Sequence, residues 1–435
     1  MIKKQNIIDN KLFFPLLMWL SSRIFICIIM LLIVPLLPVP SGGVAAKFGW
    51  DVFFSWDSIF YEAIATFGYN YSVPGKQLPS VAFFPLFPLI SHALMSVGLP
   101  FKVAATLVNN LAFLGALIVL YAWMNERHGT SKARWVTAVL AWCPLSLFGT
   151  VIYSEGLYLL FSTATLKAFD KQQYGWTALW GAIATVARPT GIALIPALLL
   201  VSFFERRSVK AYIASLAAGG GLYLFSLYCQ ITMGDALAFL HAQKAWRPSL
   251  GFDWLRWLKM IMQIVVGTTN WNYGYIKDPV HPLLFAIIIA SASLLWYFRK
   301  KLDATKVNYG FACLGLFLWL LAGDPLTNVV MIFGGIYLLW LLRRELSLIT
   351  VVYGFCGIGM LLASGGTISL NRLSYGIVSL AIACGVLLAR HPFWGRAVIG
   401  FFAILLASFA VRFAQDQWVA YKVFFVCFVS SPEVS

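Results

Sequence analysis

The scarcest feature of this 435-residue chain is charge, because Asp, Glu, Lys and Arg together make up only 11% of it. A soluble domain carries roughly 25% charged residues, so this composition excludes an ordinary soluble protein. Hydrophobic residues make up 61% of the chain, and the mean hydropathy is +0.83. No segment has the composition of a soluble domain, so residues 1–435 are predicted to form a single transmembrane domain.

Cysteines with motif spacing are also missing. The seven cysteines lie almost entirely within apolar runs, and none shows CxxC or metal-ligand spacing. They are expected to pack as small hydrophobic residues, which excludes a disulfide framework and a zinc site. The chain also lacks the paired broken helices of an inverted repeat, which many secondary transporters contain.

Long apolar runs, in contrast, recur from one end of the chain to the other. About 20 such residues cross a bilayer as a helix, since barrel strands would alternate instead. The first run, from Leu12 past Val34, lacks a small-residue cleavage site and is expected to be a membrane helix rather than a removed signal. Spans are predicted at 12–37, 103–123, 133–150, 153–170, 174–187, 190–204, 211–231, 282–298, 307–322, 326–342, 347–363, 373–389 and 397–412.

The number of crossings is uncertain at one place, where Arg188-Pro189 separates two short apolar segments. Residues 174–187 and 190–204 form either a re-entrant pair or two short tilted spans. The sequence therefore predicts an all-α polytopic membrane protein with about 11 to 13 transmembrane helices.

The net charge of +16 arises from 32 basic and 16 acidic residues. If the N-terminus is cytoplasmic, most basic residues fall in the short inner loops, as the positive-inside rule requires. The basic excess thus indicates topology and not nucleic-acid binding. It leaves two long loops, 38–102 and 232–281, on the non-cytoplasmic face.

Both long loops contain an amphipathic helical pattern. In the first loop, Phe60, Ile64 and Phe67 share one face, while Asp57 and Tyr61 share another. Helices of this type lie along the headgroup zone of a membrane. In the second loop, the apolar stripe consists of Trp254, Leu258, Ile261 and Val265.

Most of the unusual polar residues fall on the same non-cytoplasmic face. Their convergence is what an outer active site requires, but loop polarity alone also produces it. The structural alternatives are a helix-start carboxylate for Asp57, loop polarity for Glu155, membrane anchors for Arg188 and Arg372, and lipid contact for Lys244. The set consists of Asp57, Glu62, Glu155, Arg188, His241, Lys244, Trp246, Arg247, Asp324 and Arg372.

The first outer loop combines Trp56-Asp57, Tyr61, Gly68-Tyr69 and the run from Ala82 to Pro85. This combination resembles the first lumenal loop of the PIG-V-type mannosyltransferases, which add the second mannose to glycosylphosphatidylinositol and have many prokaryotic relatives. Three further segments agree in order and spacing, namely PLSLFGTVIYSEGLY (144–158), ARPTG (187–191) and QKAW (243–246), the last two leaning toward the prokaryotic branch.

The resemblance implies a GT-C-class membrane glycosyltransferase that takes a sugar, here mannose, from a polyprenyl-phosphate donor and inverts its anomeric centre. The family's catalytic acid lies in the first outer loop, which makes Asp57 the candidate general base. Direct displacement needs one base for the acceptor hydroxyl, while fixed cations stabilise the leaving phosphate. The candidate substrate-binding residues are Trp56, Tyr61, Tyr69, Glu155, Arg188, His241, Lys244, Trp246 and Arg372.

The same resemblance sets the expected partners and location. These are a lipid-linked sugar donor, a lipid, glycan or protein acceptor and membrane lipids, with no nucleic acid. No cofactor or metal ligand is expected, although a divalent metal stays open. The location is a prokaryotic plasma (inner) membrane, or the endoplasmic reticulum if the chain is eukaryotic.

Two other functions remain open at this point. A transporter or flippase of a lipid-linked saccharide predicts charged residues near the bilayer midplane, where only Arg23 is clearly inside a span. An inactive relative that serves as a membrane assembly partner is the other alternative.

Overall fold

The computed structural model describes residues 12–40, 42–69, 79–244, 251–367 and 369–417. The regular elements in these ranges are all helices, apart from one isolated β-bridge between Gly251 and Ser364, which confirms the all-α prediction. The described residues divide into two compact units, one formed by those up to Phe252 together with those from Gly335 onward, and the other by Asp253–Gly334. Both units contain apolar helices, and the single-domain prediction stays a prediction.

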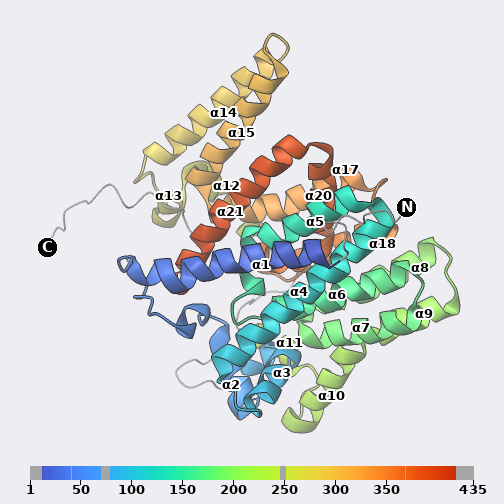
Figure 1. Ribbon diagram of the computed structural model, residues 1–435. Helices are drawn as coiled ribbons and strands as arrows, with labels where there is room; N and C mark the ends of the chain where they lie inside the picture. Colours follow the sequence, from blue (N-terminus) through green and yellow to red (C-terminus); the bar gives the residue numbers. More distant parts are fainter. Residues whose placement is uncertain (1–11, 41, 70–78, 245–250, 368, 418–435) are drawn as a thin grey trace, which may run out of the picture. The chain divides into compact units, whose positions relative to one another are not determined.

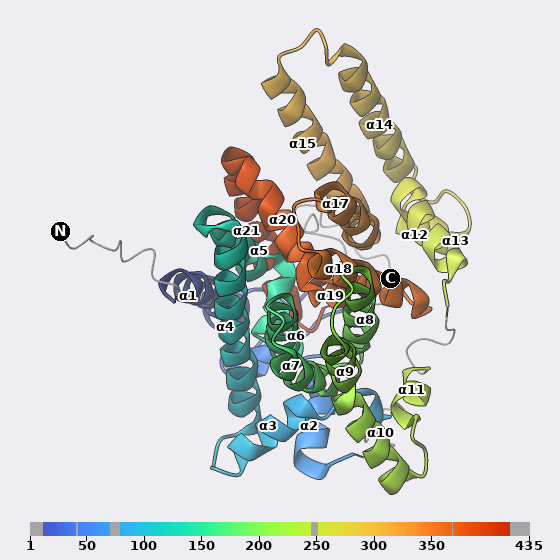
Figure 2. The ribbon, with the colours of Figure 1, turned by 90° about the vertical axis from the view of Figure 1, so that its right-hand side faces the viewer.

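The first unit is built around a long helix, α4 (Phe101–His128), which packs against α6 (Glu155–Asp170). On its other side, α6 packs against α7 (Tyr174–Ala187), and the three helices lie side by side (Figures 1 and 2). The N-terminal helix α1 (Phe13–Cys27) contacts α4 and α5 (Thr130–Trp142). Other helices of this unit are α8 (Leu194–Phe204), α9 (Val209–Ala217), α10 (Gly220–Met233), α17 (Gly335–Leu342), α18 (Leu348–Ala363), α20 (Val378–Arg390) and α21 (Pro392–Ala414).

Three shorter helices gather with α10 at one end of this unit (Figures 1 and 2). They are α2 (Ser58–Phe67), α3 (Leu86–Met95) and α11 (Ala238–Gln243). A buried aromatic group formed by Phe84, Phe225 and Phe239 holds α10 and α11 to the segment before α3. The helix predicted in the first outer loop is therefore confirmed as α2.

The second unit contains α12 (Trp254–Val266), α13 (Thr268–Tyr273), α14 (Val280–Phe298), α15 (Ala304–Ala322) and α16 (Asp324–Val329). The amphipathic helix predicted here is confirmed as α12. Its buried face carries Trp257, Met260 and Ile264, and the Trp257 ring packs 5.0 Å from that of Phe333. The predicted apolar stripe is on the exposed face of the helix, where Trp254, Leu258 and Ile261 lie.

Seven helical stretches of the described chain are long and apolar enough to cross a membrane, which supports an integral multi-pass protein. The other predicted spans are shorter or interrupted helices. The seven long apolar stretches are Phe13–Leu36, Phe101–His128, Val209–Met233, Val280–Phe298, Ala304–Ala322, Asp324–Leu342 and Pro392–Ala414.

The prediction of one continuous span at 133–150 is wrong. Helix α5 ends at Trp142, and a 3₁₀ turn, η6 (Pro144–Gly149), follows it. Cys143 has φ −49° and ψ 137°, because a residue that precedes a proline is pushed out of the helical region. This break places the polar backbone of η6 inside the unit, where it needs internal hydrogen-bond partners.

Candidate functional site

The Trp56-Asp57 segment joins η4 (Trp50–Phe53) to α2 and has an unusual backbone. Trp56 has φ 60°, in the left-handed region that bulky residues rarely adopt. Such strain persists only where the surrounding structure enforces it, and it is concentrated at functional sites. Asp57, the next residue, takes the N-cap position of α2 with its side chain 22% exposed.

A second segment, just before α6, is hydrogen-bonded to this one. The Ile152 amide donates to the Phe53 carbonyl at 3.2 Å, and the Ser58 hydroxyl donates to the Ile152 carbonyl at 3.1 Å. The Tyr61 and Ser154 hydroxyls lie 2.9 Å apart. These contacts fix the start of α6 beside the start of α2, although the two are far apart in the sequence.

Gly156 and Asn109 set how closely α6 approaches α4. A Cβ atom on Gly156 would lie 2.3 Å from the Asn109 carbonyl oxygen, so no larger residue fits there. The Gly156 amide donates to Asn109 Oδ1 at 2.8 Å, and Asn109 Nδ2 donates to the carbonyls of Phe148 and Val151, both at 2.7 Å. Buried Asn109 thus holds Glu155, the first residue of α6, in place from both sides.

Arg23 of α1 satisfies the backbone of η6. Its Nη1 donates to the Ser146 carbonyl at 2.8 Å and to Thr150 Oγ1 at 2.6 Å, and its Nη2 donates to the Ala141 carbonyl at 3.2 Å. The one cation that sequence reasoning placed inside a span is therefore a packing residue. The sequence signal for both Arg23 and Asn109 was a polar side chain in an apolar run, and neither was predicted as part of the site.

Two arginines reach the site from distant elements. Arg188 precedes Pro189 and is extended, with φ −155° and ψ 149°, which ends α7. Arg372 lies on the short helix α19 (Leu370–Tyr375), which the Tyr375 hydroxyl anchors by donating to the Leu140 carbonyl at 2.8 Å.

These elements bring four charged side chains together, Asp57, Glu155, Arg188 and Arg372, which we call the buried charge cluster. Arg372 Nη1 lies 2.6 Å from Asp57 Oδ2, and its Nε lies 3.5 Å from Glu155 Oε1. Arg188 Nη1 forms an ion pair with the same Glu155 oxygen. The side chain of Glu155 is fully buried, and those of Arg188 and Arg372 are 10% and 12% exposed.

Aromatic groups enclose this cluster. The Arg372 guanidinium lies 5.0 Å from the centroid of the Tyr153 ring, and the Asp57 amide donates to the Tyr153 hydroxyl at 3.3 Å. Burial lowers the pKa of Arg372, but Asp57 and Glu155 raise it by more, so its pKa lies above the ordinary value. Burial also raises the pKa of Tyr61 to about 12, so its phenol stays protonated.

The other candidate residues lie elsewhere or outside the described ranges. The Tyr69 hydroxyl donates to the Phe83 carbonyl at 2.7 Å, and exposed His241 pairs with Asp235 at 2.7 Å. Within the described ranges, Tyr69, His241 and Lys244 form no hydrogen bond or ion pair with the buried charge cluster. Trp246 lies outside the described residues.

No group of three or more His, Cys, Asp or Glu side chains in the described ranges is placed to hold a metal ion. The two carboxylates of the buried charge cluster face arginines instead. Guanidinium groups are strong hydrogen-bond donors to anionic groups, and here they face these two carboxylates.

The sequence model of the family described as Mannosyltransferase (PIG-V) matches residues 15–239, and no curated protein matches the chain significantly. Among solved structures, the oligosaccharyltransferase of Archaeoglobus fulgidus in complex with Zn and sulfate is 12% identical over 93% of this chain and 53% of its own, with a TM-score of 0.43. The archaeal oligosaccharyltransferase AglB from Archaeoglobus fulgidus, in complex with an inhibitory peptide and a dolichol-phosphate, is 12% identical over 94% of this chain and 56% of its own, with a TM-score of 0.43.

ArnT from Cupriavidus metallidurans bound to undecaprenyl phosphate is likewise 12% identical, over 84% of this chain and 77% of its own, with a TM-score of 0.38. The chain thus spans about half the length of the archaeal enzymes. This likeness is too distant to transfer a role to any residue.

Proposed function

Because the chain belongs to the mannosyltransferase (PIG-V) family, we propose that it transfers a sugar, most simply mannose, from a polyprenyl-phosphate donor to an acceptor hydroxyl with inversion. The observation that carries this proposal is the buried charge cluster. In it the partly exposed carboxylate of Asp57 pairs with Arg372, and fully buried Glu155 links Arg372 to Arg188. Displacement of a lipid phosphate requires a carboxylate that acts as the base and fixed cations that stabilise the leaving phosphate.

Asp57 acts as the general base. Its Oδ2 is held by Arg372, while its Oδ1 makes no hydrogen bond within the described chain. Oδ1 takes the proton of the acceptor hydroxyl as that oxygen attacks C1 of the donor sugar. The C1–O bond to the phosphate breaks with its electron pair, and the lipid phosphate leaves.

The arginines stabilise the charge that develops on the leaving phosphate. Within the described ranges, Nη2 of Arg372 makes no hydrogen bond, so it can donate to a phosphate while Nη1 stays on Asp57. Arg188 is held on the other side of Glu155. Charge-assisted hydrogen bonds from guanidinium to phosphate are among the strongest that a protein forms.

The proposed location follows from α6, whose two ends differ. Its N-terminal end carries the buried charge cluster. At its other end Lys171 follows the helix, and Arg127 of α4 pairs with Asp170, while Lys132 lies in the first turn of α5, directly after α4. Under the positive-inside rule this distribution supports a cytoplasmic position for the basic end. The site then faces the non-cytoplasmic side of a plasma membrane, with the N-terminus inside.

The direct test is Asp57→Asn in vesicles that contain the purified chain and radiolabelled polyprenyl-phosphate mannose. Loss of the base is expected to lower sugar transfer about 10²- to 10⁴-fold at unchanged protein yield. Asp303→Asn is the matched control, because Asp303 caps α15 and Asn caps a helix equally well. Wild-type rates in Asp57→Asn remove this role, and saccharide movement without a new glycosidic bond indicates a transporter.

A further inference from the structure

A second site adjoins the buried charge cluster on the other side of Trp56. It is an open pocket of about 430 Å³ between the segment after α1, the Trp56-Asp57 segment, the start of α4 and the end of α21. This volume falls within the range of small-ligand sites, roughly 300–1,000 Å³. Trp56 lines the pocket, and Asp57 is the next residue in the chain.

The walls of this pocket are fixed by the fold. The Val44 amide donates to the Gln415 carbonyl at 2.9 Å, which ties the segment after α1 to the end of α21. The Ser55 hydroxyl donates to the Phe413 carbonyl at 3.1 Å, which ties the Trp56-Asp57 segment to the same helix. The pocket is therefore a built feature of the first unit.

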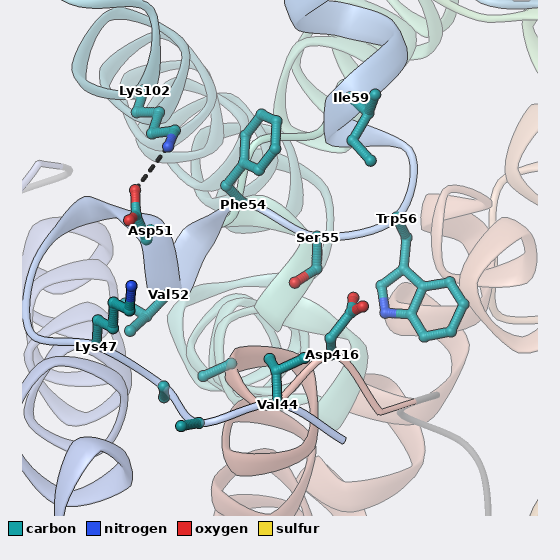
Figure 3. A pocket seen from close by; sticks show the side chains of 13 residues that line it. Val44, Lys47, Asp51, Val52, Phe54, Ser55, Trp56, Ile59, Lys102 and Asp416 are labelled. Carbon is teal, nitrogen blue, oxygen red and sulfur yellow. Dashed lines mark hydrogen bonds and ion pairs between the residues drawn. The ribbon is translucent and has the colours of Figure 1, made fainter. Parts of the chain in front are cut away.

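The lining combines rings with groups of both charges. Lys47, Asp51 and Lys102 lie on one side, and Trp56 and Asp416 lie on the other (Figure 3). Lys102 Nζ is 2.6 Å from Asp51 Oδ1, so this cation is already neutralised. The two lysines and two aspartates of the lining together carry no net charge.

Such a lining matches a neutral, polyhydroxylated ligand. An indole offers an apolar face for the C–H surface of a sugar ring, carboxylates accept hydrogen bonds from hydroxyls, and ammonium groups donate to them. We infer that this pocket binds the acceptor of the proposed transfer and that the acceptor is a neutral glycan headgroup. This inference rests on the proposed function and adds the acceptor class and its binding site.

The pocket lies next to the proposed base, because Trp56 in its lining directly precedes Asp57. A sugar held against Trp56 lies one residue from Asp57, since consecutive Cα atoms are about 3.8 Å apart. In this arrangement a free hydroxyl at the edge of the sugar reaches past Trp56 to the base, which itself lies outside the lining, and the donor phosphate takes the arginine side of Asp57. The strained backbone at Trp56 separates the two subsites.

Two variants test the pocket without changing the buried charge cluster. Ala45 lines the pocket and is exposed, so Ala45→Trp fills it, and Val39→Trp is the control at an exposed position of the same segment outside the lining. Asp416→Asn removes one carboxylate and keeps a residue that tolerates its φ of 55°. It serves as the second variant if Ala45→Trp fails to fold.

The assay supplies radiolabelled polyprenyl-phosphate mannose and graded amounts of the lipid and glycan extract of membranes that lack this chain. Both variants are expected to raise the apparent KM for the extract about tenfold, which corresponds to about 1.4 kcal/mol of binding. The KM for the donor, and donor hydrolysis without extract, should stay at the values of the wild type and of Val39→Trp.

The outcomes separate the two proposals. An unchanged KM for the extract in an active enzyme, a raised KM for the donor, or label found only in protein overturns the inference and leaves sugar transfer intact. A wild-type chain that neither transfers nor hydrolyses the donor removes the proposed function, and the acceptor pocket with it.

Discussion

The two ends of α6 carry ion pairs of similar geometry in very different surroundings. At the N-terminal end, Arg372 lies 2.6 Å from Asp57, and fully buried Glu155 faces two arginines. At the other end, Lys171 lies 2.6 Å from Glu126, with both side chains more than a third exposed. Distance alone therefore does not distinguish the two regions, but burial does.

The difference in burial implies a difference in cost. Exposed pairs contribute about 0–1 kcal/mol, because water screens them and solvates either partner alone. Buried ions each cost several kcal/mol of desolvation, which only good geometry offsets. Because desolvation makes four such groups unfavourable inside an apolar fold, we expect them to have a function. Substitutions at the two ends of α6 should separate their effect on stability from their effect on sugar transfer.

The largest effect on stability is expected from Glu155→Gln. It leaves Arg188 and Arg372 beside each other without the carboxylate between them, and breaking a buried pair costs about 3–5 kcal/mol. Thermal unfolding in detergent measures this loss, with Glu126→Gln at the exposed end as the control. Equal unfolding temperatures for the two variants would show that burial does not distinguish the two ends.

Arg372→Lys tests whether the guanidinium geometry of Arg372, and not only its positive charge, is needed for sugar transfer. Lysine keeps the positive charge but loses the planar fork that holds Asp57 and leaves Nη2 for a phosphate. The value of kcat/KM for the lipid-phosphate donor is expected to fall about a hundredfold, which corresponds to about 2.7 kcal/mol. Arg127→Lys, at the half-exposed pair with Asp170 near the other end of α6, should leave donor kinetics unchanged, and equal kinetics in both variants would contradict the assignment.

Gly156→Ala tests the packing that places Glu155. The added methyl group meets the Asn109 carbonyl, so α6 must shift away from α4 at a cost of roughly 1–3 kcal/mol. Transfer activity should fall together with unfolding temperature. Gly400→Ala is the matched control in α21, since a Cβ atom there meets nothing within 4 Å.

The smallest effect is expected for Lys171→Gln at the exposed end of α6. Removing this pair should change the free energy of unfolding by less than about 1 kcal/mol and leave transfer unaffected. Urea unfolding of the purified chain measures the first quantity, and the vesicle assay measures the second. A loss of unfolding free energy as large as that of Glu155→Gln would show that the ion pairs at the two ends of α6 contribute equally to stability.

Much of the fold was predictable from local pattern. The length of the apolar runs located the long membrane helices, and helical periodicity located α2 and α12. The break at Cys143 was missed because hydropathy hardly changes at Pro144, whereas the backbone does. Arg23 was correctly predicted to lie inside a span, but its structural role was not predicted, because that role is to donate a hydrogen bond to the backbone of η6.

The candidate site was predictable only in part. Asp57, Glu155, Arg188 and Arg372 were all candidates, but so were Tyr69, His241 and Lys244, which the structure places apart from the buried charge cluster. All seven residues were predicted to lie on the non-cytoplasmic face, so this criterion could not separate them. Contact between Arg372 and Asp57 joins residues 315 positions apart, and local periodicity carries no information on such a pair.

The sequence by itself determined that this is a helical membrane protein of the mannosyltransferase (PIG-V) family, because apolar run length and a short motif are local properties. Only the tertiary structure decided which polar residues meet. Asn109, Gly156 and two proline-induced helix ends bring the chain segments together. The burial of these side chains follows from long-range packing, which local sequence patterns do not encode. Burial gives the charges at the N-terminal end of α6 a large desolvation cost, whereas the exposed pair at the other end has almost none.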